Sequence, residues 1–187
     1  TQMKCAIFEE NGNLHSMQRA LGHVTLQNAV RRHGDFVFTS CAANALQPYL
    51  QNDNGWDQGQ VFFTPTQVWG MPPYYAQQMA SESHLPLLVK TETTISLDIT
   101  ATKDEEGRQM VVHIANITDK AVEADLEIKG LSKIEDIEVI TLSGDLKDRN
   151  TPEQPDRIIP VKKSLKADGN MKYVFPAYSY TVLKYNK

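Results

Sequence analysis

The sequence predicts an α/β segment followed by an all-β segment, and three observations predict this fold class. The 187 residues are 41% hydrophobic and 22% charged, a composition typical of globular proteins. The first 90 residues hold 11 charged side chains, whereas the remaining 97 hold 31. The hydrophobic pattern also changes, from mixed helix and strand periodicity to period-2 alternation. We therefore expect two domains, at residues 1–88 and 89–187.

The first half combines short apolar runs with one helical stripe. Apolar side chains recur every three or four residues from Leu14 to Arg32, which predicts an amphipathic helix with Asn13 as its candidate cap. Pro72 and Pro73 suit the first turn of a second helix. The expected elements are strands at residues 3–8, 35–41 and 60–63 and helices at residues 14–32 and 72–80. This order is typical of βα units in a parallel sheet or barrel, although two such units cannot close an eight-stranded barrel.

The second half reads as a series of strands with one buried and one solvent-facing side. Turn-forming residues such as those around Gly107 and Gly144 separate the apolar runs. Short strands at this spacing favour an antiparallel β-sandwich. The expected strands cover residues 95–101, 109–115, 122–128, 137–142, 171–175 and 180–185.

Charge and hydropathy exclude two classes of partner. The net charge of −4 argues against a nucleic-acid-binding protein, which would usually carry a basic face. No run of 18 apolar residues occurs, so no membrane-spanning helix is expected. The residues from Thr1 onward lack the basic and apolar regions of a signal peptide. Cys5 and Cys41 are too few for a disulfide framework, and we expect free thiols.

Two motifs in the second half carry a family resemblance. A Leu-Ser-Gly turn at residues 142–144 is followed from Asn150 to Pro160 by Asn-Thr-Pro-x-x-Pro-x-x-Ile-x-Pro. The chain then closes on Phe-Pro-Ala-Tyr-Ser-Tyr-Thr-Val-Leu at residues 175–183. Together these motifs resemble the C-terminal domain of α-L-arabinofuranosidases of glycoside hydrolase family 51. The resemblance implies that residues 1–88 are the last two βα units of a (β/α)8 catalytic barrel and that residues 89–187 are the following β-sandwich.

The resemblance also implies a catalytic residue at the end of the first strand. Glu9 and Glu10 align with the end of the seventh barrel strand, and barrel enzymes carry their active sites at such strand ends. Neighbouring side chains on a strand point to opposite faces, so only one of the two carboxylates can face a cleft. We assign the nucleophile to Glu10, because Glu9 stands where the family has Asp or Gly. Asn11 replaces the usual aromatic residue in the substrate wall.

A retaining glycosidase needs a second carboxyl group about 5–5.5 Å from the nucleophile. The family places this acid/base Glu in a Gly-Asn-Glu motif on the fourth barrel strand, and this sequence contains no such motif. We therefore expect the chain to be inactive alone. Gln60 is a candidate for recognising sugar hydroxyls, because an amide both donates and accepts hydrogen bonds. Trp56 is a candidate for stacking on a sugar ring.

The implied function is hydrolysis of terminal arabinofuranosyl residues from arabinan or arabinoxylan-type polysaccharides with retention. The resemblance implies no cofactor and no metal, and it leaves a homo-oligomer as one option. A polysaccharide substrate favours a periplasmic or extracellular location. An alternative is a non-catalytic carbohydrate-binding or accessory module, although residues 91–187 contain no tryptophan for such a role. A purely structural segment without a ligand is a further alternative.

Overall fold

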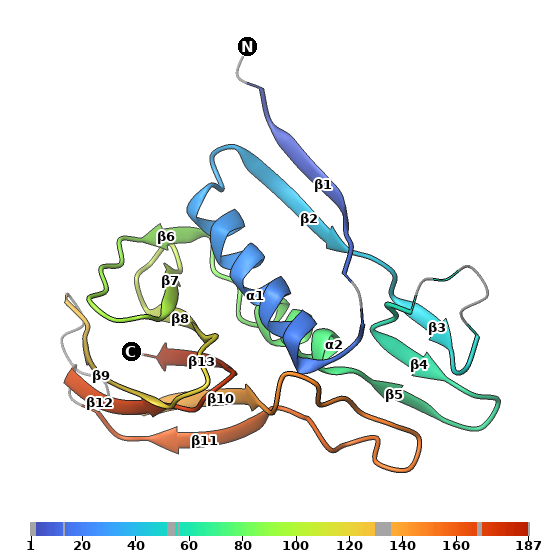
Figure 1. Ribbon diagram of the computed structural model, residues 1–187. Helices are drawn as coiled ribbons and strands as arrows, with labels where there is room; N and C mark the ends of the chain where they lie inside the picture. The colour runs from blue at the N-terminus through green and yellow to red at the C-terminus, as the bar shows by residue number, and fades with distance from the viewer. Residues whose placement is uncertain are drawn as a thin grey trace.

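The computed structural model describes residues 3–12, 14–51, 55, 57–129, 136–167 and 170–186, so Asn13 and Trp56 lie outside the described residues. Figure 1 shows how the two helices and the strands of this part are arranged. The elements are β1 (Cys5–Glu10), α1 (Met17–Arg32), β2 (Val37–Ala42), β3 (Leu46–Pro48), β4 (Val61–Phe63), β5 (Val68–Gly70), α2 (Pro72–Ser81), β6 (Leu87–Val89), β7 (Asp98–Lys103), β8 (Gln109–Asn116), β9 (Val122–Glu127), β10 (Ile137–Ser143), β11 (Val161–Leu165), β12 (Asn170–Phe175) and β13 (Ser179–Asn186).

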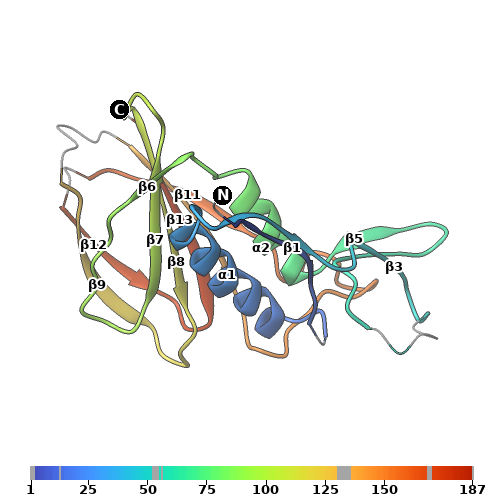
Figure 2. The ribbon, with the colours of Figure 1, turned by 90° about the horizontal axis from the view of Figure 1, so that it is seen from above.

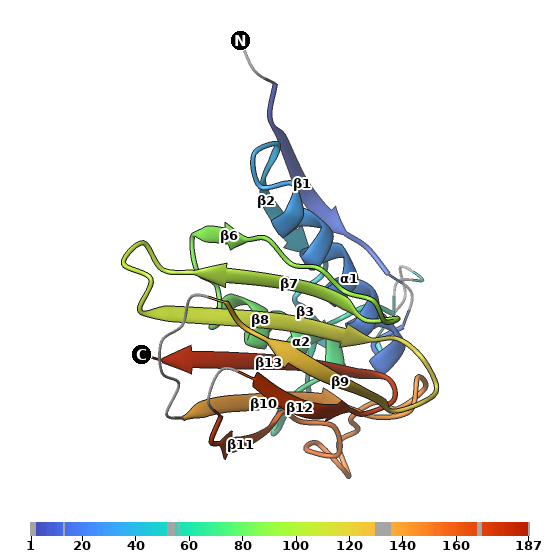
Figure 3. The same ribbon diagram turned by 90° about the vertical axis from the view of Figure 1, so that its left-hand side faces the viewer.

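The second half forms two antiparallel sheets that pack face to face. The larger sheet has the strand order β11-β10-β13-β8-β7-β6, and β12 pairs with β9 in the smaller one. Figure 3 shows β9 and β12 lying in front of the larger sheet. One hydrophobic core fills the space between the sheets, with Ile114, Ile137 and Phe175 fully buried. The predicted β-sandwich is therefore present.

Both helices cover the other face of the larger sheet (Figure 2). Met17 and Val24 of α1 and Met79 of α2 pack in one core with residues of β8, β10 and β13. As a result, β8 is buried at every residue after Gln109. The sequence predicted one buried and one solvent-facing side for this strand, and that prediction was wrong. Alternation fails here because the helices remove the second face from water.

β1 and β2 form a separate parallel pair, with α1 connecting the end of β1 to the start of β2. They lie on the side of α1 away from the sandwich (Figure 1). A fourth sheet consists of β3, β4 and β5, in which β4 pairs parallel to β3 and antiparallel to β5. Phe62, Trp69 and Met71 form a small core beneath it.

The loop between β10 and β11 ties the two halves together. Ser16 precedes α1 but makes no side-chain cap. Instead, the backbone N–H groups of Met17 and Gln18 donate to the carbonyls of Asp148 and Leu146, each at 2.9 Å. These bonds satisfy two donors that a helix start leaves without intrahelical partners. The loop that contains the Asn-Thr-Pro motif therefore fixes the start of α1.

Several short elements depart from the sequence prediction. β7 begins at Asp98, three residues later than expected, and β3, β5, β6 and β11 were not predicted. Three of these four strands have three residues, too few for a readable period. β6 pairs with β7, so the expected domain boundary at residue 88 falls within a strand of the larger sheet. Cys5 and Cys41 are free thiols, as predicted. Neither described helix is long and apolar enough to span a bilayer.

Candidate functional site

The parallel pairing of β1 and β2 brings their carboxyl ends together. Ile7 pairs with Ser40 and Glu10 pairs with Ala42, with a register shift between these two pairs. Phe8 and Glu9 together therefore lie opposite one residue of β2, which is the arrangement of a β-bulge. A bulge changes which side chains share a face. Glu10 is buried, whereas Phe8 and Glu9 are exposed.

Glu10 points toward helix α1. Its side chain is 2% exposed, and its Oε2 atom lies 2.9 Å from Nδ1 of His23. His23 lies on α1, and its side chain is 4% exposed. The carboxylate is therefore enclosed between the strand and the helix.

Glu9 points away from this enclosed region. Its Oε2 atom accepts a hydrogen bond from Nδ2 of Asn11 at 3.2 Å. The Oδ1 atom of Asn11 in turn accepts from Nε2 of Gln58 at 3.1 Å, and Oε1 of Gln58 accepts from the backbone N–H of Gly12 at 3.3 Å. A chain of amides therefore holds the exposed carboxylate at the strand end.

The two carboxylates lie on opposite faces, as the sequence predicted, but their orientations are reversed. The family resemblance assigns the nucleophile to Glu10, which would then face the cleft. The structure encloses Glu10 against His23 and presents Glu9 to solvent. The choice of Glu10 came from the family resemblance, which does not carry the strand register; in the structure a register shift at Phe8 and Glu9 precedes Glu10, and Glu10 bonds to His23.

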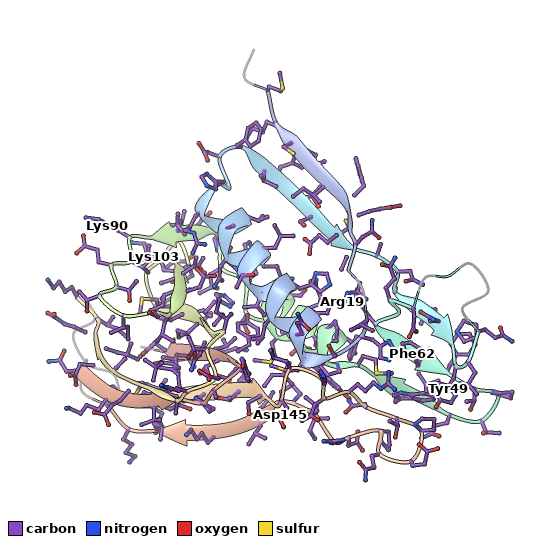
Figure 4. All side chains as sticks on the ribbon, viewed as in Figure 1. Arg19, Tyr49, Phe62, Lys90, Lys103 and Asp145 are labelled. Atoms are coloured by element: carbon purple, nitrogen blue, oxygen red, sulfur yellow. The ribbon has the colours of Figure 1, made fainter. Side chains whose placement is uncertain are left out.

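Arg19 lies in the first turn of helix α1 (Figure 4) and contacts several parts of the site. Its Nη1 group donates to the backbone carbonyls of Leu14, at 3.3 Å, and Gln58, and its Nη2 group donates to that of Ala43. Its Nε group donates to Nε2 of His23 at 3.0 Å. Burial lowers the pKa of the Arg19 guanidinium, and the negative charge of Glu10 opposes this shift. Sequence reasoning missed Arg19 and His23. Their spacing of four residues on one helix was the only signal.

Gln47 organises the loop that precedes β4. Its Oε1 atom accepts from the backbone N–H groups of Gln58, at 3.2 Å, and Gly59, at 2.7 Å. Its Nε2 atom donates to Oδ1 of Asp57 at 3.1 Å. A Cβ atom on Gly59 would lie 2.4 Å from Cβ of Gln47, so only glycine allows this close approach.

The structure describes two of the three predicted substrate-binding residues, Asn11 and Gln60. Asn11 lies at the end of β1 beside Glu9. Gln60 is 7% exposed, and its backbone N–H donates to the carbonyl of Ala45, which places it next to the loop that follows β2. Trp69, the other tryptophan, is 4% exposed and packs against Phe62. Trp56 lies outside the described residues, so its role stays a prediction.

His15 is where a residue of the second half, Arg149, contacts the candidate site. Its ring packs against Phe62 at 4.8 Å, and Nδ1 lies 3.4 Å from Oδ1 of Asp57. Arg149, from the loop between β10 and β11, approaches Nε2 of His15 to 3.4 Å. Burial lowers the pKa of His15, which Asp57 opposes and Arg149 reinforces. Among the residues that the structure describes, no three His, Cys, Asp or Glu side chains gather where they could share a metal ion.

A family model decides where this chain belongs. The model described as the α-L-arabinofuranosidase C-terminal domain matches residues 7–179. The chain belongs to the α-L-arabinofuranosidase C-terminal domain family. The motifs from Asn150 to Pro160 and at residues 175–183 led to the same family, so that prediction is confirmed. No curated protein is similar enough in sequence to give a match.

Solved arabinofuranosidases share the fold of this family member. The arabinose-bound family 51 α-L-arabinofuranosidase MgGH51 superimposes with a TM-score of 0.85 at 21% identity, over 92% of this chain and 28% of that one. An arabinose complex of the enzyme from Thermotoga maritima gives 0.84 at 16% identity, over 98% and 43%. Xylanase C of glycoside hydrolase family 30 from Talaromyces cellulolyticus gives 0.72 at 14% identity, over 100% and 42%. The chain therefore spans less than half the length of these enzymes.

Proposed function

We propose that this chain is the C-terminal part of a retaining α-L-arabinofuranosidase that releases terminal arabinofuranosyl residues from arabinan or arabinoxylan-type polysaccharides. The family membership supports the reaction class. The observation that carries the proposal is a carboxylate at the end of a parallel strand, held by Asn11 and Gln58 and open to solvent. Barrel glycosidases place their catalytic carboxylates at such strand ends.

We further propose that β1, α1 and β2 are part of a (β/α)8 barrel within residues 1–88, with the sandwich in residues 89–187. β1 and β2 form a parallel two-stranded sheet, and within the described residues each has one edge without a partner strand. Phe8 and Phe38 on these strands are 76% and 64% exposed. An isolated pair of strands is marginally stable, and exposed aromatic rings indicate a missing layer. Further barrel strands would cover both.

The structure favours Glu9 over Glu10 as the nucleophile of this proposal. In a barrel the helices cover the outer face, so side chains that point away from α1 point toward the barrel axis. Glu9 is exposed and bonds to Asn11, which is not on α1, whereas Glu10 hydrogen-bonds to His23 on that helix. A nucleophile must reach the anomeric carbon of the sugar, and a carboxylate that is 2% exposed cannot. The proton donor would come from another strand of the barrel.

An arabinofuranose-configured epoxide tests the proposal directly, because such probes esterify the catalytic nucleophile. We expect peptide mass spectrometry of the labelled arabinofuranosidase that contains this segment to place the ester on Glu9. A label on Glu10 would return the role to the residue that the sequence predicted. Labelling confined to other parts of an active enzyme would exclude a nucleophile from this segment.

A non-catalytic carbohydrate-binding module is the second candidate. A shallow pocket lies on the smaller sheet, formed by β9 and β12. It is lined by Asp125, Leu126, Glu127, Asn170, Met171 and Lys172. None of these six side chains is aromatic, so none offers a ring face for stacking on a sugar. Calorimetry with arabino-oligosaccharides distinguishes the candidates: binding that survives removal of the Glu9 carboxylate and of Asn11 would favour the module.

The location follows from the proposed substrate. A polysaccharide lies outside the cytoplasm, so the proposal places the enzyme in the periplasm or outside the cell. The exposed Phe8 and Phe38 surface also favours self-association of the isolated chain. No cofactor enters the proposed reaction, because two carboxyl groups and water are sufficient for it.

A further inference from the structure

One buried cation joins three loops that lie far apart in the sequence. Arg19 is 6% exposed and donates to the backbone carbonyls of Leu14, Ala43 and Gln58. Leu14 lies between β1 and α1, Ala43 lies between β2 and β3, and Gln58 lies between β3 and β4. Guanidinium groups present several donors in a rigid plane, which suits one side chain to several acceptors. The three loops therefore share one anchor.

The first loop also packs directly on the stem of this side chain. A Cβ atom on Gly12 would lie 3.0 Å from Nε and 3.2 Å from Cγ of Arg19. Any larger residue at this position would press on Arg19. Gly12 also donates its backbone N–H to Gln58. The loop that leaves β1 is therefore held against Arg19 by contact as well as by hydrogen bonds.

The hydrogen-bond chain from Arg19 to Glu10 has a defined direction. A guanidinium has donors only, so Nε2 of His23 must accept from Arg19 and carry no proton. The proton of the neutral imidazole then sits on Nδ1 and is donated to Oε2 of Glu10 at 2.9 Å. Glu10 supplies the negative charge that a buried guanidinium requires, because an unpaired buried charge is costly.

We propose that Glu10, His23 and Arg19 are positioning residues for the strand end that carries Glu9. This inference rests on the proposed function and deepens it, since it gives Glu10 a role other than that of the nucleophile. Arg19 holds the carbonyl of Gln58, and the side chain of Gln58 holds Asn11, which donates to Glu9. A shift of about 1 Å in such a support can cost a glycosidase roughly a hundredfold in rate.

Hydrogen exchange of the 187-residue chain tests the shared anchor without any need for activity. In Arg19→Met we expect faster amide exchange in residues 11–16, 43–47 and 57–61 together, and in Arg19→Lys a smaller increase in the same segments. Arg32→Met is the matched control, because Arg32 lies on the same helix but pairs with Asp98 at its exposed end. Faster exchange confined to residues 11–16, or equal exchange in the Arg32→Met control, would overturn the proposal.

The tautomer of His23 gives a spectroscopic signature that packing alone would not produce. We expect the imidazole ¹⁵N shifts to show a protonated Nδ1 and an unprotonated Nε2 in the wild-type chain. In Arg19→Met the Arg19 donor is lost, so the two neutral tautomers of His23 should both be populated and interconvert. A wild-type His23 with its proton on Nε2 would contradict the proposed direction of the network.

Chemical rescue separates positioning from nucleophilic catalysis in the arabinofuranosidase that contains this segment. Azide should restore turnover to Glu9→Ala but not to Glu10→Ala, because only the lost nucleophile leaves room for an external anion at the anomeric carbon. Glu10→Gln should retain more activity than Glu10→Ala, since an amide oxygen can still accept from His23. Azide rescue of Glu10→Ala would overturn the assignment.

The proposed function and the positioning network are tested by different measurements. If the epoxide labels no carboxylate of this segment, the proposed function fails. Amide hydrogen exchange and the His23 tautomer then still decide whether Glu10, His23 and Arg19 form the proposed network. If Glu9 is labelled but exchange in the three loops does not change in Arg19→Met, only the positioning network fails.

Discussion

Asn150 donates a hydrogen bond from Nδ2 to the backbone carbonyl of Gly70, 2.8 Å away, and so links the loop after β10 to strand β5. The same group donates to the carbonyl of Ile158 at 3.0 Å, and Oδ1 accepts from the N–H of Ile158 at 2.8 Å. Asn150 is 1% exposed. The asparagine of the Asn-Thr-Pro motif therefore joins the two halves of the chain.

Removal of this amide should destabilise the chain. In Asn150→Ala the backbone groups of Gly70 and Ile158 lose their partners in a buried place, and we expect a loss of about 2–4 kcal/mol in the free energy of unfolding. Urea denaturation measures this loss. Asn186→Ala, at an exposed position on β13, is the control and should change the free energy by less than about 0.5 kcal/mol. Equal losses in both variants would contradict the role of Asn150.

Two glycines should respond in opposite directions to substitution by alanine. Gly59→Ala places a Cβ atom 2.4 Å from Cβ of Gln47, and we expect a loss of about 1–3 kcal/mol from the resulting overpacking. Gly22 lies on α1 with nothing within 4 Å of an added Cβ atom. Gly22→Ala should therefore stabilise the helix by about 0.5–1 kcal/mol. Thermal unfolding of both variants checks the signs, and destabilisation by Gly22→Ala would contradict the described packing.

Acid should weaken the fold through two buried histidines. Burial lowers the pKa of His113 well below the ordinary value of 6.5, and the nearby charge of Arg31 acts in the same direction. Burial also lowers the pKa of His15. A folded-state pKa below the unfolded one means that stability is complete above about pH 6.5 and falls as the unfolded chain takes up protons below it.

The measurement is the free energy of unfolding between pH 7.5 and pH 5. We expect this free energy to decline below about pH 6.5 in the wild-type chain. The decline should be smaller in the double variant His15→Gln with His113→Gln, because neither amide titrates. His113 shares a hydrogen bond of 2.7 Å with Tyr180, so the double variant should also be less stable at every pH. An unchanged slope would show that other groups cause the acid sensitivity.

The open face of β1 and β2 should make the isolated chain self-associate. Phe8 and Phe38 are 76% and 64% exposed, and the proposed barrel would cover them. Phe8→Ser combined with Phe38→Ser should reduce the sedimentation coefficient of the isolated chain toward that of a monomer. Val161→Ser is the control, because Val161 is 65% exposed on β11, outside the proposed barrel. Equal reduction by the control would argue against a specific apolar face.

The end of the strand could be predicted from the sequence, but the burial of its two carboxylates could not. The pattern around Glu9 and Glu10 predicted the end of a strand, and β1 ends at Glu10. Alternation allowed only one of the two carboxylates to face a cleft, and the family resemblance selected Glu10, whereas the structure buries Glu10 after a register shift against β2. A bulge depends on how two strands pair and has no reliable signal in a single strand. Arg19 was missed for a similar reason, because its partners Ala43 and Gln58 come from distant loops.

By itself, the sequence determined the family, through the motif from Asn150 to Pro160, and the type of most longer elements. Turn residues and periodicity are local properties, so they can be read without coordinates. Only the tertiary structure decided that the central strands β8, β10 and β13 of the larger sheet are covered on both faces and that Glu10 turns toward His23. Both outcomes depend on which surfaces pack together. Packing brings together residues that are far apart in the sequence, and no local pattern shows which of them will meet.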